Sequence, residues 1–208
     1  FTKLETTKYV RISSTEDLVM DKNYLIVCET RSGVMGSIYN SNYRSLVTSG
    51  LTLTDGVATV QEGCEASIFK LGGTTGAYTF YDGTYYLANT SGTQLNSVLN
   101  GTAETSKWGI SFSGNDAVIT SSTSNTIRYN TSFADFWTGT SNSASVQLYK
   151  EVSVSKPVIS PESGTYLNSN APIEVTITCS TEDAVIYYTT DGTDPTANST
   201  HYVEAFEL

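Results

Sequence analysis

The chain has 208 residues, which is enough for one large domain or two small ones. Charged residues make up only 15% of it, and the formal net charge is −10. Residues 1–150 hold ten Lys or Arg against twelve Asp or Glu, whereas residues 151–208 hold one against nine. Neither part offers the basic surface that neutralises phosphates, so the composition argues against a nucleic-acid partner.

The rest of the composition favours β structure throughout. The chain contains 14 Tyr and is rich in Thr, Ser, Gly and Asn, with few stretches of helix-forming residues. No run of about 18 apolar residues occurs, so we expect no insertion into a membrane. The chain opens with Phe1-Thr2-Lys3-Leu4 instead of Met. We therefore expect a processed or excised piece, with neighbouring domains of a longer polypeptide as partners.

Proline marks a boundary between two domains. The first 156 residues contain none, and all four prolines follow, at Pro157, Pro161, Pro172 and Pro195. The composition also shifts at residues 152–157, as it does in linkers. The sequence predicts one domain at residues 1–152 and a second at residues 153–208.

A weak internal repeat runs through the first domain. Phe69, Trp108 and Leu148 follow similar small polar residues at spacings of 39 and 40 residues. Three strand-like segments open the repeats, at residues 9–12, 77–80 and 117–120. This order predicts a β-trefoil-like module of about twelve strands, in which Phe69, Trp108 and Leu148 are buried at equivalent positions. A two-sheet sandwich gives a similar alternation and stays open as the alternative.

Turn signals and one insert complete this prediction. Asp55-Gly56, Asp82-Gly83 and Gly114-Asn115 each separate strand-like runs, as hairpin turns do. Residues 146–149 should pair with residues 9–12 and so remove open edges. Residues 32–49 read as a flexible insert in the first repeat.

The second domain carries a sharper motif. Pro157-Val158-Ile159-Ser160-Pro161 and the following Gly164-Thr165-Tyr166 lead to Ile186-Tyr187-Tyr188-Thr189-Thr190-Asp191-Gly192-Thr193-Asp194-Pro195-Thr196. Residues 156–208 resemble the C-terminal immunoglobulin-like domain of chitobiases and β-hexosaminidases. The resemblance implies a fibronectin-like β-sandwich, truncated here, that acts as a non-catalytic spacer. The first 150 residues look, more loosely, like β-trefoil-like modules of bacterial surface and secreted proteins, which implies an extracellular or cell-surface location.

Catalytic and metal motifs are not evident. The single histidine, His201, has no G-x-S-x-G elbow beside it, so we read it as a solvated strand residue. A carboxylate pair such as Asp82 with Asp135 arises by chance among 21 acids, most of which stand at turns. Asp191 and Asp194 fit a turn better than a calcium loop. We therefore predict no enzyme activity, no metal and no cofactor.

Cysteine and asparagine patterns add little. Cys28, Cys64 and Cys179 are an odd number at irregular spacing, which favours small buried side chains; a Cys28–Cys64 bridge is the alternative. Four sequons occur, at Asn89, Asn100, Asn130 and Asn198. In a chain this rich in Ser, Thr and Asn they are expected by chance.

Two segments combine the side chains that sugar recognition uses, namely aromatic faces and polar partners for hydroxyls. We expect stacking from Tyr39, Tyr43 and Trp137, and polar contacts from Asn42, Arg44 and Asp135. In the alternative interpretation Phe133 and Phe136 cover the barrel and Trp137 only flanks them. The sequence predicts a non-catalytic accessory region that binds a glycan. A structural spacer or protein-interaction module presenting a neighbouring enzyme stays open, and a hydrolase is the third hypothesis.

Overall fold

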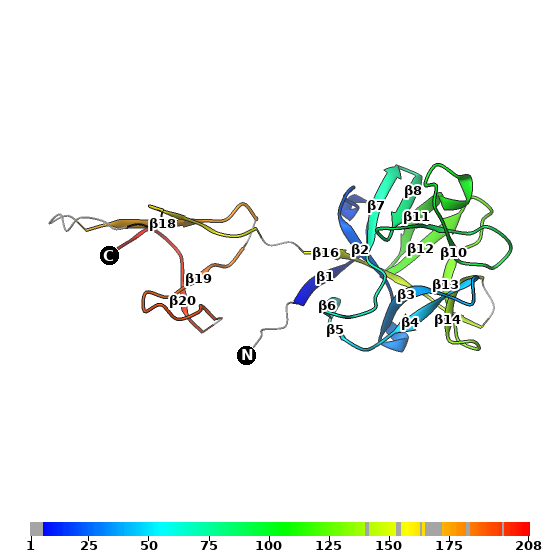
Figure 1. The fold of residues 1–208 in the computed structure, drawn as a ribbon, viewed down its shortest axis with the longest axis horizontal. Coiled ribbons are helices and arrows are strands. Elements are labelled where there is room, and N and C mark those ends of the chain that lie inside the picture. The colour runs from blue at the N-terminus through cyan, green and yellow to red at the C-terminus, as the bar shows by residue number, and fades with distance from the viewer. Residues whose placement is uncertain are drawn as a thin grey trace. The chain divides into compact units, whose positions relative to one another are not determined.

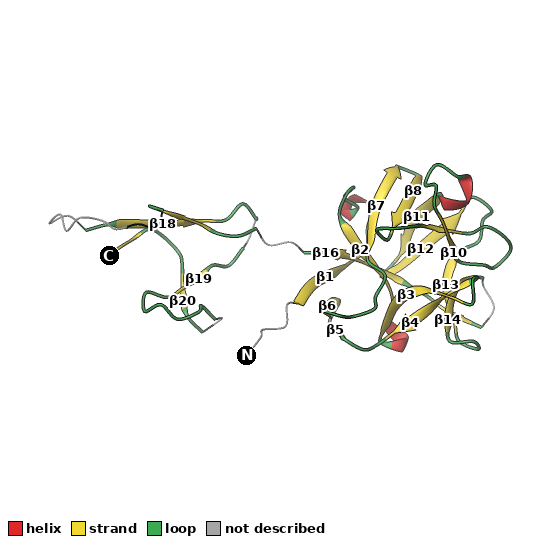
Figure 2. Cartoon of the chain, in the orientation of Figure 1, coloured by secondary structure: helices red, strands yellow, loops and turns green. Residues whose placement is uncertain are grey.

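The computed structural model describes residues 6–139, 142–152, 155–162, 164, 172–181, 184–196 and 198–208. The chain divides into two compact units, residues 1–152 (unit 1) and residues 153–208 (unit 2). Both are built of strands, as the composition predicts, and Figure 1 and Figure 2 show how few helical turns accompany them. These are three 3-10 turns within the described residues: Thr15–Asp17, Glu29–Arg31 and Glu104–Ser106. None of the helices described is long and apolar enough to cross a membrane.

Unit 1 is a continuous sheet of sixteen described strands. Most are short, and tight turns join many of them. The strands are β1 (Thr6–Ile12), β2 (Asn23–Cys28), β3 (Gly33–Tyr39), β4 (Tyr43–Val47), β5 (Leu51–Thr54), β6 (Val57–Gln61), β7 (Phe69–Thr74), β8 (Ala77–Tyr81), β9 (Tyr86–Ala88), β10 (Asn96–Val98), β11 (Trp108–Ser113), β12 (Asp116–Ser121), β13 (Ile127–Asn130), β14 (Asp135–Thr138), β15 (Ser143–Ala144) and β16 (Gln147–Glu151).

Six of these strands close into a ring. Antiparallel pairing runs from β2 to β7, then to β8, β11 and β12. An isolated bridge between Ala117 of β12 and Val146 leads to β16, and β16 pairs with β2 again. The ring therefore has no open edge, which removes a surface that could pair with another chain.

Three hairpins stand on this ring: β3–β4, β9–β10 and β13–β14. They contact one another through backbone hydrogen bonds. Strand β14 pairs with β4 at Phe136 and Arg44, the N–H of Leu95 donates to the carbonyl of Asn42, and the N–H of Thr138 donates to the carbonyl of Thr93. The three hairpins thus hold each other in register across long sequence separations.

Strand β2 lies between two hydrophobic clusters. Tyr24, Ile26 and Cys28 belong to the large cluster inside the ring, together with Phe69, Trp108 and Leu148. Leu25 and Val27 point to the opposite face and join a second cluster with Tyr9, Ala58 and Tyr149. Successive side chains of a strand alternate between faces. Because both faces of β2 are covered, its unbroken apolar run is fully buried.

The second cluster is covered by β1 and the β5–β6 hairpin. Strand β1 pairs with β16 on one side, with Ile12 opposite Leu148, and with β6 on the other. The predicted pairing of these two segments is thus confirmed, although residues 9–12 lie opposite residues 148–151 and not opposite residues 146–149. Residues 9–12, the predicted opening segment of the first repeat, lie in β1 outside the six-stranded ring. Strand β2 takes the corresponding position in the ring. Strands β1, β5, β6 and β15 also raise the number of strands above the predicted twelve.

The local predictions for turns agree with the structure. Asp55-Gly56, Asp82-Gly83 and Gly114-Asn115 each join two antiparallel partners. Phe69, Trp108 and Leu148 are all fully buried in the ring cluster. Residues 32–49 differ from the expected flexible insert, because they form the β3–β4 hairpin.

The three cysteines are free thiols, so the alternative of a Cys28–Cys64 bridge does not hold. Cys28 is buried in the ring cluster, whereas Cys64 packs against the second cluster. Cys64 and Cys179 are half-buried and donate to the carbonyls of Ser49 and Ser155, both at 3.2 Å. The prediction of a small buried side chain is right for Cys28 only.

Unit 2 contains a three-stranded sheet, ordered β17 (Val158–Ser160), β18 (Glu174–Thr178) and β21 (Phe206–Glu207), and a hairpin of β19 (Tyr187–Tyr188) with β20 (Thr200–His201). Val175 and Ile177 alternate inward on β18, and Tyr188 stacks on Phe206 with ring centroids 4.4 Å apart. His201 is exposed on a strand, as predicted. The carboxylate of Asp191 accepts from Thr193 and forms the predicted turn. Thr165 and Tyr166 of the motif lie outside the described residues.

Candidate functional site

The two segments that the sequence singles out for recognition meet in unit 1. Strand β4 pairs with β14, which brings the end of the β3–β4 hairpin beside β14 and the β13–β14 turn. Between them lies a hollow of about 240 Å³. Its walls combine aromatic rings and side-chain amides around one carboxylate. The residues that line it are Tyr39, Asn40, Tyr43, Asn130, Phe133, Asp135 and Trp137.

One wall is the end of the β3–β4 hairpin. Tyr39 and Tyr43 are opposite each other in the ladder, and the turn between them places Asn40 and Ser41 in the left-handed region, with φ of 43° and 66°. Asn tolerates this conformation better than most residues. Tyr39 is 41% exposed and Tyr43 is half-buried. Both rings are therefore held by a paired hairpin rather than by a flexible loop.

The other wall is the β13–β14 hairpin. The side-chain oxygen of Asn130 accepts from the backbone N–H of Ser132 at 3.0 Å and from that of Phe133 at 3.2 Å, which fixes the turn. Phe133 projects from this turn and is 75% exposed. Along β14, Phe136 enters the ring cluster, so its neighbours Asp135 and Trp137 lie on the opposite face.

Asp135 is the one charged residue among the seven that line the hollow, and it is only 3% exposed. Its Oδ2 accepts from the Tyr39 hydroxyl at 2.8 Å, whereas its Oδ1 is buried without a hydrogen-bond partner. Burial raises the pKa of Asp135, and the hydrogen bond from Tyr39 opposes the rise. The same hydrogen bond raises the pKa of Tyr39. A buried acceptor without a donor lowers the stability of the fold.

Trp137 also buries a polar atom that has no partner. Its indole Nε1 is also buried without a hydrogen-bond partner. The ring lies against Gly139, where an added Cβ would come within 2.8 Å of Cζ2. Gly139 thus leaves room for the present position of the ring. Asp135 and Trp137, two residues apart on one face of β14, thus each bury one polar atom that has no hydrogen-bond partner.

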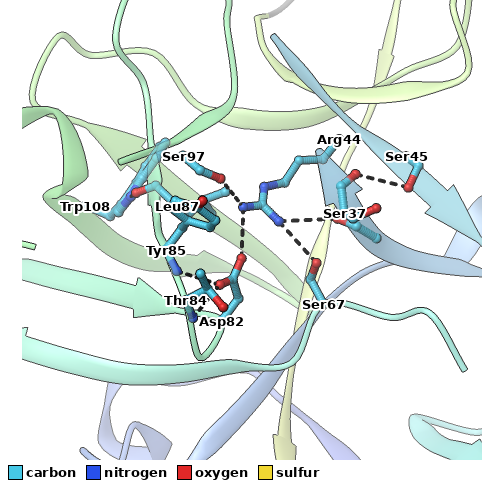
Figure 3. Close-up of polar contacts among 11 residues, drawn as sticks. Ser37, Arg44, Ser45, Ser67, Asp82, Thr84, Tyr85, Leu87, Ser97 and Trp108 are labelled. Carbon is cyan, nitrogen blue, oxygen red and sulfur yellow. Dashed lines mark hydrogen bonds and ion pairs between the residues drawn. The ribbon is translucent and has the colours of Figure 1, made fainter. Parts of the chain in front are cut away.

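Arg44 has a different place from the one predicted. It is 1% exposed, and its guanidinium points into the interior, as Figure 3 shows. It donates to the carbonyl of Gly36 (3.3 Å) and to Ser67 (3.1 Å), Ser97 (2.6 Å) and Asp82 (3.3 Å). Because Tyr43 faces the hollow, the next residue on the strand faces the other way. Arg44 therefore supports the hollow from inside and is not one of its contact residues.

Asn42 is not a contact residue of the hollow either. It is half-buried and its backbone carbonyl accepts from Leu95, but it does not line the hollow. Tyr39, Tyr43, Asp135 and Trp137 are the predicted residues that the fold brings together. Phe133 and the amides Asn40 and Asn130 were missed. The alternative interpretation, in which Phe133 and Phe136 both cover the barrel, is right for Phe136 and wrong for Phe133, which is exposed at a turn between Asn130 and Asp135.

The residues weighed for catalysis are placed elsewhere. Asp82, the chance partner of Asp135, does not line the hollow; it accepts from Arg44 and from the N–H groups of Thr84 and Tyr85. Over the described residues, no group of three or more His, Cys, Asp or Glu is arranged to hold a metal ion. Of the sequons, Asn89 is 2% exposed and Asn130 is 4% exposed, so neither amide is open to modification in the folded unit.

Comparison with known proteins gives information about unit 2 only. A search of curated protein sequences finds no match. Among solved structures, "Crystal structure of lysenin pore" is similar with a TM-score of 0.44 and 10% identity, covering 67% of this chain and 49% of that one. The chain thus spans about half the length of that protein, and a likeness at this score carries no argument. Residues 161–208 match the family model of the chitobiase/beta-hexosaminidase C-terminal domain.

Proposed function

We propose that unit 1 is a non-catalytic glycan-binding module and that the hollow between the β3–β4 and β13–β14 hairpins is its binding site. The single observation that carries this proposal is the convergence of Tyr39, Tyr43, Phe133 and Trp137 around the buried Asp135. Aromatic faces pack against the apolar side of a sugar ring, and the carboxylate and amides bind its hydroxyl groups. These residues come from hairpins about 90 residues apart, so the cluster is a product of the fold.

The size of the hollow fits a small ligand. Sites for drug-sized molecules measure about 300–1,000 Å³, and this one measures about 240 Å³. One sugar ring at the end or side of a longer glycan suits that space. The exposed Phe133 and Tyr39 stand at its rim, where further rings of the glycan can rest.

The proposal includes the architecture. The closed ring of six strands and its three mutually bonded hairpins support assignment of unit 1 as a β-trefoil-like module, with β1 and β5–β6 added outside. The family match supports unit 2 as an immunoglobulin-like spacer, since it is to a C-terminal domain of glycosidases and not to their catalytic part. We place the protein at the surface of a bacterial cell or outside it, within a longer polypeptide.

A glycan array followed by calorimetry tests the function. Trp137→Ala and Tyr43→Ala should each remove about 1–2 kcal/mol of binding free energy, a tenfold or greater loss of affinity. Tyr85→Ala is the matched control, because Tyr85 is 43% exposed and does not line the hollow. Binding that survives both site variants would place the glycan elsewhere on the protein.

The second candidate function is a structural spacer or protein-interaction module that presents a neighbouring enzyme. The observation that favours it is the match of unit 2 to an accessory domain. A wild-type protein that binds nothing on a broad array would favour this function over the first.

A further inference from the structure

We infer that the hollow selects amino sugars that carry a free amine, and that Asp135 is the residue that determines this specificity. The inference rests on the proposed glycan-binding function and names the ligand class. It comes from the one carboxylate in the lining of the hollow and from the aromatic rings around it.

The carboxylate of Asp135 has no cation beside it. It takes part in neither ion pair found over the described residues, which are Arg11 with Glu29 and Arg44 with Asp82. Its Oδ2 accepts instead from the neutral hydroxyl of Tyr39. A buried charge is costly unless it is paired. Because Asp135 lines the hollow, a ligand that brings a positive charge there would supply the missing counter-charge.

The aromatic walls favour the same ligand. A cation over the face of Tyr, Trp or Phe is attracted by the ring, and four such rings line the hollow. A hydroxyl and an ammonium can both donate to the carboxylate, but only the ammonium also brings the opposite charge, and the attraction between charges is stronger beside a buried group than in water. An ammonium group should therefore bind better here than a hydroxyl. An acidic sugar brings a second negative charge to a hollow without a cation, so it should be rejected.

A quaternary ammonium lacks the N–H that a carboxylate binds, so the ligand should carry a primary amine. Because the inference rests on glycan binding by the hollow, that amine is the amine of an amino sugar.

The test uses the full chain labelled with ¹⁵N and follows its two indole N–H signals. Trp108 is fully buried and donates to the carbonyl of Leu87, so its signal is the internal reference, while that of Trp137 reports the hollow. The ligands are a glucosamine oligomer, its N-acetylated counterpart, a glucose oligomer, a glucuronic acid oligomer and a lysine-containing peptide. The titrations are run at about 150 mM salt, which screens attraction to the acidic surface.

We expect the glucosamine oligomer to bind about tenfold more tightly than its N-acetylated counterpart. Asp135→Asn should reduce this preference to less than about twofold. Asp55→Asn is the matched control, since it removes one charge from an exposed turn outside the hollow, at a left-handed position that Asn tolerates. This variant should keep the preference.

The remaining outcomes distinguish a failure of this inference from a failure of the proposed function. If neutral and amino sugars bind equally, or the acidic sugar binds best, the inference is wrong while glycan binding stands. If the preference persists in Asp135→Asn, Asp135 is not its source and the inference also fails. If the lysine peptide alone moves the Trp137 signal, the partner is a protein. If no ligand moves that signal and the glycan array is silent, the proposed function itself fails.

Discussion

Replacement of Arg44 by Met should destabilise unit 1 strongly, although both residues have long side chains. Arg44 is the most buried charged residue in the unit and connects four segments through Gly36, Ser67, Asp82 and Ser97. Met would fill part of the space but leave the carboxylate of Asp82 without its cation. It would also leave the carbonyl of Gly36 without this donor.

The magnitude follows from burial. Removal of one partner of a buried ion pair costs about 3–5 kcal/mol. The side chain of Asp82 is 19% exposed, so water offsets part of the loss. We therefore expect about 3 kcal/mol, the lower end of that range, or a fall of about 6–12 °C in melting temperature. Asp82→Asn leaves Arg44 buried without its counter-ion, so the double variant should cost little more than Arg44→Met alone.

Urea unfolding followed by tryptophan fluorescence measures this cost. Both tryptophans, Trp108 and Trp137, lie in unit 1, so the signal reports that unit. Arg31→Met is the matched control, because Arg31 is exposed and lies over the ring of Tyr129 at 5.8 Å. If Arg44→Met lowers the free energy of unfolding by less than about 1 kcal/mol, or by no more than Arg31→Met does, the buried ion pair does not hold the hairpins together.

Three further predictions concern Tyr9, Asp135 and Gly139. Burial and Glu151 raise the pKa of Tyr9 to about 12, whereas a Tyr in the unfolded chain deprotonates near pH ~10. The free energy of unfolding should therefore fall by about 2–3 kcal/mol as the pH rises from ~10 towards ~12. Urea titrations across this range should show a smaller fall for Tyr9→Phe. Burial raises the pKa of Asp135, so the folded state is more stable while this carboxyl is protonated and becomes less stable as it ionises. Asp135→Asn should therefore have a free energy of unfolding at least as large as that of the wild type at neutral pH. In acid the two free energies should become equal. Gly139→Ala should shift the indole signal of Trp137 and leave that of Trp108 in place, because the added Cβ would lie 2.8 Å from the Trp137 ring; an unchanged Trp137 signal would show that the ring is not held by this contact.

Local features of the fold were predictable because they depend on neighbouring residues. Asp55-Gly56 is a turn by its own backbone preferences, with φ of 48° and 78°. The choice of ring strand was not predictable in this way. Residues 9–12 and β2 both have strand-like patterns, and what distinguishes them is that β2 is covered on both faces. That coverage depends on the β5–β6 hairpin and on β16, which lie far along the chain.

The site was predictable in its residue types but not in its geometry. Aromatic residues beside Asp and Asn indicated Tyr39, Tyr43, Asp135 and Trp137. The sequence could not tell that Tyr43 faces outward and Arg44 inward, because a strand presents alternate residues to opposite faces and only the tertiary contacts decide which face is covered. The partners of Arg44 stand 8 to 53 residues away along the chain, and Tyr39 meets Asp135 across 96.

A crystal structure of the full chain with the strongest glycan from the array tests the central claim most directly. The account predicts a sugar ring in the hollow between the β3–β4 and β13–β14 hairpins, in contact with Trp137 and with the side chain of Asp135. A glycan bound at another surface of unit 1, or on unit 2, with the hollow unchanged, would contradict it.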